Sequence, residues 1–266
     1  MRNAIQPTVD SLLGVAGWRS RAVDVPAPEV DDRPSTPPPP RARLAEMVGL
    51  SAALRLPGAA LRLAGAPRGD GHVVIDLPGW KAPEASGASL RSYLRALGYD
   101  ARAWGLGVNT GNPERDAKIL SKTVVRLAEH HGPVSMVGWS LGGVVAREVA
   151  REHPDAVRRL ITYGTPVIGG PTYTLGAGAY GEAECARITR LTEELDRTRP
   201  ITVPVTTIYT RRDGVVAWQA CLDHASPYVE HVEVASTHLG MGVDPDVWSV
   251  IADRLALSVH SAGGVG

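Results

Sequence analysis

The strongest sign of chemistry in this sequence is a serine flanked by glycines, in Gly138-Trp139-Ser140-Leu141-Gly142. The apolar run VSMV precedes this motif and the helical pattern VVAREVA follows it. The order predicts a strand, a sharp turn and a helix, with the serine hydroxyl presented at the turn. Gly138 and Gly142 supply the small residues that such a turn needs two positions before and after the serine. We therefore expect Ser140 to be a nucleophile.

A nucleophilic serine needs a general base, and the base needs an acid that orients it. His238 comes directly after the predicted strand YVEHVEV, whereas His224, in the polar stretch CLDHASP, is the alternative base. Asp213 follows the apolar run VPVTTIYT and precedes His238 by 25 positions, enough for one helix containing Asp223 and one strand. The chain order serine, acid, histidine is that of a large class of serine hydrolases. We expect Ser140, Asp213 and His238 to be nucleophile, acid and base.

The oxyanion that forms during acyl transfer must be bound by preorganised donors. One donor is expected to be the backbone N–H of Leu141, the residue after the nucleophile. The second donor comes from a loop after an early strand, which here is the sequence LPGW at positions 77–80. We assign it to the N–H of Trp80, with Gly79 as the alternative.

Two further apolar residues near these positions are candidates for the wall of a substrate pocket. Met241 follows the predicted base by three positions, and Trp139 directly precedes the nucleophile. Trp139 either lines the pocket or packs under the nucleophile, because a large aromatic ring suits both places.

Strands and helices alternate from residue 72 onward. The helix PERDAKILSKTVVRLAEHHG begins with Pro113 and ends at Gly132, the usual asymmetry of helix ends. Short apolar runs that end at turn residues predict strands between the helices. The pattern predicts an α/β fold: a mostly parallel central sheet of about six strands, flanked by helices. Residues 165–200 interrupt it with Gly-rich sequence and one charged helix, where a lid-like insertion would sit.

The first 40 residues differ in composition from the rest of the chain. Residues 1–40 end in four successive prolines, which favour an extended arm or linker and exclude a helix. Residues 41–64 are rich in Leu and Ala, with interspersed arginines and a break at Pro57-Gly58, and predict two short helices. We expect a single domain that spans 41–266, in which these two helices pack against the core. A role at a membrane surface is the alternative.

Composition excludes several other classes of protein. The chain has 28 Lys and Arg and 28 Asp and Glu, so no basic face for nucleic acid is expected. Cys185 and Cys221 are too few for a disulfide framework or a cysteine-rich metal site; we expect two reduced thiols, with one bridge between them as the alternative. We find neither a membrane span nor the apolar core of a secretory signal, and expect a cytoplasmic protein of undetermined oligomeric state.

The motifs DLPGW, GWSLGG, YTRRDGVV and STHLGMG, in this order, resemble the α/β-hydrolase superfamily in its bacterial serine esterase/lipase branch, over about residues 70–260. The resemblance implies a hydrolase of small-molecule or lipid esters that works through an acyl-enzyme, with no metal or organic cofactor. Two features depart from the family. No antiparallel strand pair precedes residue 72, so the sheet is expected to be reduced, and the early loop reads PGW instead of HG or HGGG.

Three alternatives remain at this level. The same triad serves acyltransferases, and the fold also occurs in non-catalytic scaffold proteins. The Pro-rich arm is also of a kind that docks to partners through polyproline recognition.

Overall fold

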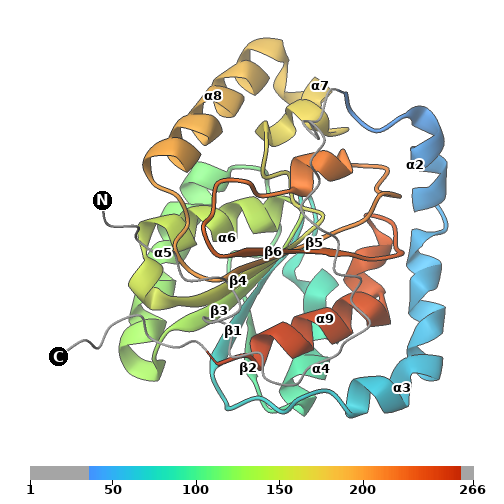
Figure 1. The fold of residues 1–266 in the computed structure, drawn as a ribbon, viewed down its shortest axis with the longest axis vertical. Helices are drawn as coiled ribbons and strands as arrows, with labels where there is room; N and C mark the ends of the chain where they lie inside the picture. Colours follow the sequence, from blue (N-terminus) through green and yellow to red (C-terminus); the bar gives the residue numbers. More distant parts are fainter. Residues whose placement is uncertain (1–35, 259–266) are drawn as a thin grey trace, which may run out of the picture.

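The computed structural model describes residues 36–258 (Figure 1). Most of the predicted Pro-rich arm, residues 1–35, lies outside the described residues, as do residues 259–266.

The centre of the molecule is a six-stranded sheet in which every neighbouring pair is parallel, as the sequence predicted. The strand order is β2-β1-β3-β4-β5-β6. The chain therefore leaves β1 toward one edge and returns to pair β3 on its other side. In open parallel sheets such a reversal leaves a crevice at the carboxyl ends of the strands, where ligands bind. The strands are β1 (Val73–Leu77), β2 (Asp100–Ala103), β3 (Val134–Trp139), β4 (Val157–Tyr163), β5 (Val205–Tyr209) and β6 (Val229–Glu233).

Each face of the sheet carries its own apolar layer. Successive strand residues point to opposite faces, so Val74 and Ile161 belong to one layer whereas Ile75 and Leu160 belong to the other. Helices cover both faces, as parallel sheets require. The first layer is completed by α4 (Ala88–Ala96) and α9 (Pro245–Leu255), and the second by α5 (Pro113–His131) and α6 (Leu141–Glu152) (Figure 1).

The helix predicted from Pro113 to Gly132 is α5, which ends at His131 with Gly132 at φ 78° as its cap. The helix expected around Asp223 is not there. The structure has only the 3-10 helix η5 (Trp218–Cys221) at this place. The Asp223 carboxylate accepts hydrogen bonds from the N–H groups of Ala225 and Ser226 and thereby folds the chain into a turn. Aspartate that bonds the backbone locally in this way competes with helix formation.

Two segments stand outside the layers. Between β4 and β5 the chain forms η4 (Gly170–Tyr173), α7 (Ala177–Tyr180) and α8 (Glu182–Thr198), drawn in yellow and orange above the sheet in Figure 1. Before β1 it forms α2 (Pro40–Glu46), η1 (Gly49–Arg55) and α3 (Leu56–Ala64), drawn in blue along one side. The remaining 3-10 helices are η2 (Glu84–Gly87), η3 (Pro154–Ala156) and η6 (Gly240–Val243).

The segment before β1 agrees in part with the prediction of two short helices, since α2 and α3 are there with the 3-10 helix η1 between them. Its inner side packs on the body of the protein, where Ala59 and Leu63 join the core. By length and composition, however, Arg41–Ala64 is a stretch that could cross a membrane, although no such stretch was expected. The stretch was not recognised in the sequence, because its arginines and Glu46 interrupt the continuous apolar run that usually marks a membrane span. In residues 36–72 no antiparallel strand pair occurs, which agrees with the expected reduced sheet.

Candidate active site

Ser140 lies between the end of β3 and the start of α6, in the crevice where the strand order reverses. Its φ of 52° and ψ of −122° are unusual for a residue with a side chain, and of the non-glycine residues described only Lys81 also has a positive φ. Holding a residue in such a conformation costs about 1–3 kcal/mol, which the surrounding structure must supply.

The two glycines of the motif permit close packing around this turn. A Cβ at Gly138 would lie 2.5 Å from the Cα of Gly143, and one at Gly142 would lie 2.5 Å from the carbonyl oxygen of Leu77. Neither glycine has a positive φ. They are therefore required by the approach of backbone to backbone, which presses β1, β3 and α6 together at the serine.

Asp213 and His238 are brought together at the carboxyl ends of β5 and β6. The Nδ1 of His238 donates to Oδ2 of Asp213 at 2.8 Å, and the two residues are only 3% and 5% exposed, respectively. The other carboxylate oxygen, Oδ1, accepts from the N–H groups of Val215 and Val216 at 2.8 and 2.7 Å. The carboxylate is thus fixed on one side by backbone and presents its free side to the imidazole.

The environment favours a charged His238 ring. Burial lowers its pKa, but the charge of Asp213, the hydrogen bond that the ring donates to that carboxylate and the charge of Glu46 outweigh burial, so the pKa is raised above the usual 6.5. With Nδ1 engaged by Asp213, the Nε2 atom remains as the ring's proton acceptor.

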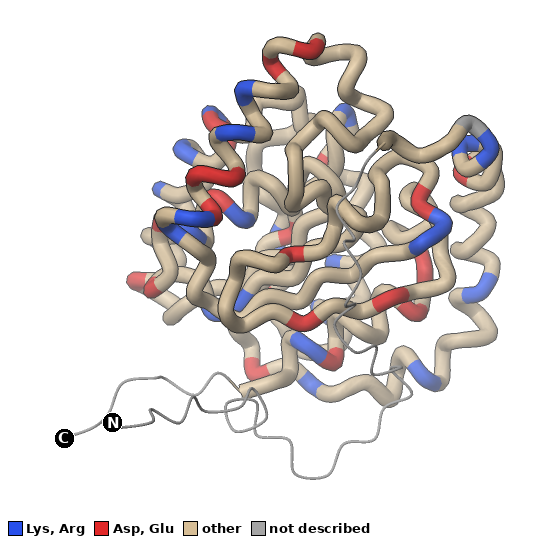
Figure 2. Tube along the Cα trace, turned by 45° about the horizontal axis from the view of Figure 1, so that its top comes forward, with Lys and Arg blue, Asp and Glu red and all other residues tan. Residues whose placement is uncertain are grey.

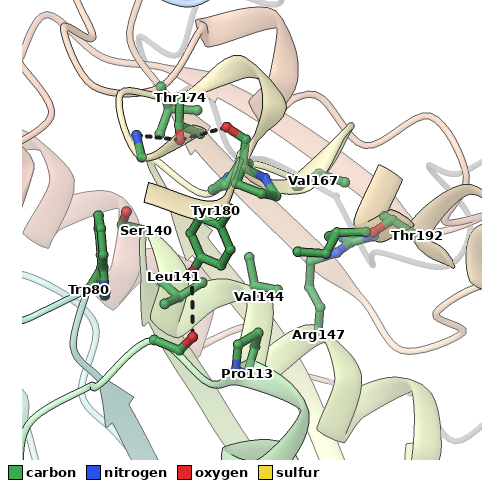
Figure 3. A pocket seen from close by; sticks show the side chains of 18 of the residues that line it. Trp80, Pro113, Ser140, Leu141, Val144, Arg147, Val167, Thr174, Tyr180 and Thr192 are labelled. Atoms are coloured by element: carbon green, nitrogen blue, oxygen red, sulfur yellow. Dashed lines mark hydrogen bonds between the residues drawn. The ribbon is translucent and has the colours of Figure 1, made fainter. Parts of the chain in front are cut away.

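Ser140 and His238 share the wall of one cavity of about 570 Å³ (Figure 3). One side of the cavity is α6, with Leu141 and Val144, and the other side is the insertion between β4 and β5. The wall has many apolar side chains, and charged residues of α5, α6 and α8 also line it. The apolar wall includes Trp80, Trp139, Leu141, Val144, Val167, Ile188, Leu191, Val215 and Val216, and the charged residues are Glu114, Arg147, Glu148, Arg151, Glu184 and Arg187.

The loop after β1 lies against the serine. A Cβ at Gly79 would stand 3.3 Å from the Cβ of Ser140. Within residues 36–258, the N–H groups of Trp80 and Leu141 have no hydrogen-bond acceptor. Buried or half-buried N–H groups are normally paired, so two unpaired donors beside one serine are what an oxyanion site needs.

Comparison with known proteins gives partial matches in sequence and broad matches in structure. No family model matches the chain. The pimeloyl-(acyl-carrier protein) methyl ester esterase of Aromatoleum aromaticum is 36% identical over 92 residues, which are 35% of this chain and 36% of that protein. The biotin biosynthesis bifunctional protein BioHC of Teredinibacter turnerae is 32% identical over 106 residues, which are 37% of this chain and 18% of that protein. The chain thus spans about a third or less of the length of these relatives.

Solved structures match over most of the chain. A lipase-esterase related protein from Clostridium acetobutylicum superimposes with a TM-score of 0.52 at 11% identity, covering 71% of this chain and 97% of that one. A metagenome-derived lipolytic enzyme gives a TM-score of 0.53 at 18% identity, covering 71% and 93%. This protein has the α/β-hydrolase fold. At these identities the likeness establishes the architecture alone, and the chemistry of this protein must be argued from its own residues.

One pocket residue expected from the sequence lies elsewhere. Met241 is completely buried in the core and is not among the residues that line the cavity. A Cβ at Gly164 would stand 2.8 Å from Cε of Met241 and 2.9 Å from Nδ1 of His238. The methionine side chain therefore packs against this glycine, close to the His238 ring. Trp139 takes the first of the two places that we considered. It lines the cavity, and its ring stacks on Tyr163 and contacts the His238 ring at 5.7 Å between centroids.

Two histidines near the site, His224 and His231, do not line the cavity. His224, the alternative base, is exposed and packs beside His231. The Nε2 of His231 accepts from the N–H of Asp223, which explains a histidine inside a strand by a structural role. Among residues 36–258 no group of three or more His, Cys, Asp and Glu is placed to hold a metal ion. Cys185 and Cys221 are both buried free thiols.

Two polar residues at the site were not found from the sequence. Asn109 is completely buried. Its side-chain Nδ2 donates to the backbone carbonyl of Pro78, and its backbone carbonyl accepts from the N–H of Lys81. It thereby pins the loop that carries Trp80. An asparagine in a glycine-rich loop gives no signal of this role, because its partners are set by the fold.

Glu46, on α2, is the second residue that sequence analysis missed. Its Oε1 accepts from the N–H groups of Gly214 and His238, at 2.7 and 2.9 Å, and its Oε2 accepts from Leu239 N–H at 2.8 Å. The residue is 7% exposed. One signal was present in the sequence: Glu46 is the only acidic residue in the Leu/Ala-rich segment 41–64.

Proposed function

We propose that this α/β-hydrolase cleaves carboxylic esters through an acyl-enzyme on Ser140. The observation that carries the proposal is the buried Asp213–His238 hydrogen bond, whose histidine lines the same cavity as Ser140, which sits at a strained turn. A nucleophile, a base and an acid that orients the base are the parts that acyl transfer by a serine requires.

In the proposed reaction the Nε2 of His238 takes the proton of the Ser140 hydroxyl as its oxygen attacks the ester carbonyl carbon. Asp213 keeps the proton of His238 on Nδ1 and stabilises the imidazolium that forms. The N–H groups of Leu141 and Trp80 bind the oxyanion, and removal of one such donor typically costs about 3–4 kcal/mol in the barrier. The imidazolium then protonates the departing alcohol. A water molecule, deprotonated by the same ring, repeats the attack and releases the acid.

The cavity favours an apolar acyl group next to the serine. Leu141 and Val144 present apolar side chains along α6 (Figure 3). The insertion closes over them: the Tyr180 ring packs on Trp80 at 6.2 Å between centroids, and its hydroxyl reaches the carbonyl of Gly111 at 3.5 Å. We therefore assign residues 165–200 the role of a lid, which must move to admit a long acyl chain. One of the two partial relatives is named as a methyl ester esterase, which supports an ester substrate.

A fluorophosphonate probe, used alongside p-nitrophenyl esters from acetate to palmitate, tests the proposal. We expect one probe molecule bound per chain, at Ser140, and turnover with an optimum at short or medium acyl chains. Labelling of Ser140 without release of p-nitrophenol would favour an acyltransferase, and added acceptor alcohols would then restore product formation. A folded protein that neither reacts with the probe nor hydrolyses any ester would contradict the proposal and favour a non-catalytic scaffold.

A further inference from the structure

The segment before β1 has an outer face of large apolar side chains in contact with solvent. We call these residues the apolar face: Leu44, Met47, Val48, Leu50, Leu54 and Leu61. They are 62–91% exposed, and every other large apolar side chain described is 49% exposed or less. Single exposed apolar residues are ordinary, but a contiguous group marks a surface that is covered by something else.

The inner side of the same segment is attached to the body of the protein. Gly49 lies directly on η6, where a Cβ would collide with Thr237 and approach Gly240. Arg55 donates to Asp244 at 3.1 Å, and Arg62 pairs with Asp246 at 2.7 Å. Because one side is held in this way, the segment cannot thread a bilayer without leaving the fold. Its apolar face is instead presented along the surface of the molecule.

The charges on this segment have a single sign. Arg41 and Arg43 are exposed at one end, Arg55 and Arg62 toward the other end are half exposed and paired with Asp244 and Asp246 of the body, and the only acidic residue of the segment, Glu46, is buried. The charge available to a partner is therefore that of Arg41 and Arg43. In Figure 2 the segment is largely tan, with blue positions toward both ends. Two copies meeting through this face would bring arginines together. Anionic lipid headgroups attract them, and apolar side chains flanked by arginine are the pattern of helices that lie in a membrane surface.

The apolar face also adjoins the cavity. Leu239 belongs to the cavity wall, is 37% exposed, and is joined to α2 through its N–H and the carboxylate of Glu46. A surface bound along α2 and η1 would therefore lie next to the part of the cavity wall that Leu239 forms.

We propose that the apolar face docks this protein onto bilayers that contain anionic lipid, with residues 41–64 parallel to the membrane plane. The docking is a property of the surface, and its test does not depend on ester hydrolysis.

The test is co-sedimentation of the full chain with vesicles of phosphatidylcholine alone or mixed with phosphatidylglycerol. All proteins carry Ser140→Ala so that no lipid is cleaved. We expect binding that is stronger to the mixed vesicles and weakened by salt. Adding Leu54→Ser and Leu61→Ser should lower the partition coefficient by about tenfold or more, because two exposed leucines no longer enter the lipid. The control is Ile119→Ser on α5, an exposed apolar residue outside the segment, which should bind as the parent does.

Two results would overturn the proposal. One is no sedimentation with either vesicle, or binding that Leu54→Ser with Leu61→Ser leaves unchanged. The other is a parent chain that runs as a dimer on size exclusion, becomes monomeric with the two serines, and ignores vesicles. In that case the occupant of the apolar face is a second copy.

A different observation on the same segment concerns the catalytic loops. The loop after β5, which holds Asp213, and the loop after β6, which holds His238, come from separate strands. The Glu46 carboxylate binds N–H groups of both loops, at Gly214 and at His238 and Leu239. A single buried carboxylate therefore joins the acid loop to the base loop.

Few charged groups act on the His238 ring. They are Asp213, from the loop after β5, and Glu46, from α2. Cys221, from η5, faces Asp213 from its other side, and burial holds the pKa of its thiol well above the usual value, so it stays neutral. Removal of the Glu46 charge would thus leave Asp213 as the one group that favours the imidazolium.

We infer that Glu46 is a positioning residue, which holds Asp213 and His238 in register and favours protonation of the His238 ring; the inference rests on the proposed function. In Glu46→Gln one amide nitrogen replaces a carboxylate oxygen, so a donor faces a donor and the negative charge is lost. We expect kcat/KM to fall about tenfold. The acidic limb of its pH profile should move to lower pH by roughly half a unit to one unit. Glu46→Asp keeps the charge and should keep the limb near its original pH.

The pKa of His238 is also read directly, from the ring resonances of the histidine-labelled protein. Asp244→Asn is the matched control. Asp244, directly before α9, is also a buried carboxylate, but its charge does not act on His238. An unchanged His238 pKa in folded Glu46→Gln overturns the inference, whether or not the parent hydrolyses esters. A parent with no turnover at all would instead count against the proposed function.

Discussion

Ser140→Ala should lower kcat for ester hydrolysis by about 10⁴ to 10⁶-fold. The hydroxyl is the proposed nucleophile, and Ser140 is the only serine among the described residues that line the cavity with His238. The fold should survive. Within residues 36–258 the Ser140 side chain makes no hydrogen bond, whereas its backbone N–H donates to Tyr163 O at 2.9 Å and its carbonyl accepts from Thr165, and alanine keeps both backbone contacts.

The measurement is kcat on a p-nitrophenyl ester, together with fluorophosphonate labelling and thermal unfolding. Ser121→Ala is a matched control, because Ser121 is a buried serine on α5 whose hydroxyl has no partner. It should label and turn over as the parent does. If folded Ser140→Ala hydrolyses esters at the parent rate, Ser140 is not the nucleophile.

Asp213→Asn should lower kcat by about 10⁴-fold, through the tautomer of His238. The side-chain oxygen of asparagine will take the place of Oδ1, because that position accepts from the N–H groups of Val215 and Val216. The amide nitrogen must then face Nδ1 of the ring. It donates where the carboxylate accepted, so Nδ1 becomes an acceptor and the ring proton moves to Nε2. The ring can no longer take the proton of the nucleophile.

Asp223→Asn is the control for a lost buried carboxylate. Asp223 accepts from Arg147 at 2.5 Å and from the hydroxyl of Ser226 at 2.6 Å, and it does not line the cavity. Its replacement leaves Arg147 without its closest partner, which should cost stability of about 3–5 kcal/mol with kcat little changed. Steady-state kinetics and chemical unfolding on both variants separate the two effects. A loss in kcat below tenfold for Asp213→Asn would show that another group orients His238.

Much of this molecule follows from local sequence. The strand, turn and helix around Ser140 were predicted because apolar residues, two glycines and a helical pattern occur together within residues 134–150. The same holds for the helix from Pro113 to His131, whose ends carry residues that only suit helix ends. The parallel sheet followed from the alternation of such elements, since a strand–helix–strand unit has one favourable way to close. Asp213 and His238 were identified by their places at strand ends.

Other features depend on contacts between distant parts of the chain. Glu46 meets His238 across 192 positions, and Asn109 meets Pro78 across 31, so no local pattern marks either as part of the site. Met241 follows the base in sequence but its side chain is buried in the core, where the absence of a side chain at Gly164 leaves room for it.

The apolar residues of 41–64 also show what local sequence cannot determine, namely which side of a helix is buried. Their composition predicted helices that cover a core, yet only Ala59 and Leu63 of the segment are buried apolar residues in the core. Composition and spacing determine which elements form, because helices and strands depend on near neighbours. Which side of an element meets the core, a cavity or solvent depends on the packing of all the others, and only the tertiary structure decided it.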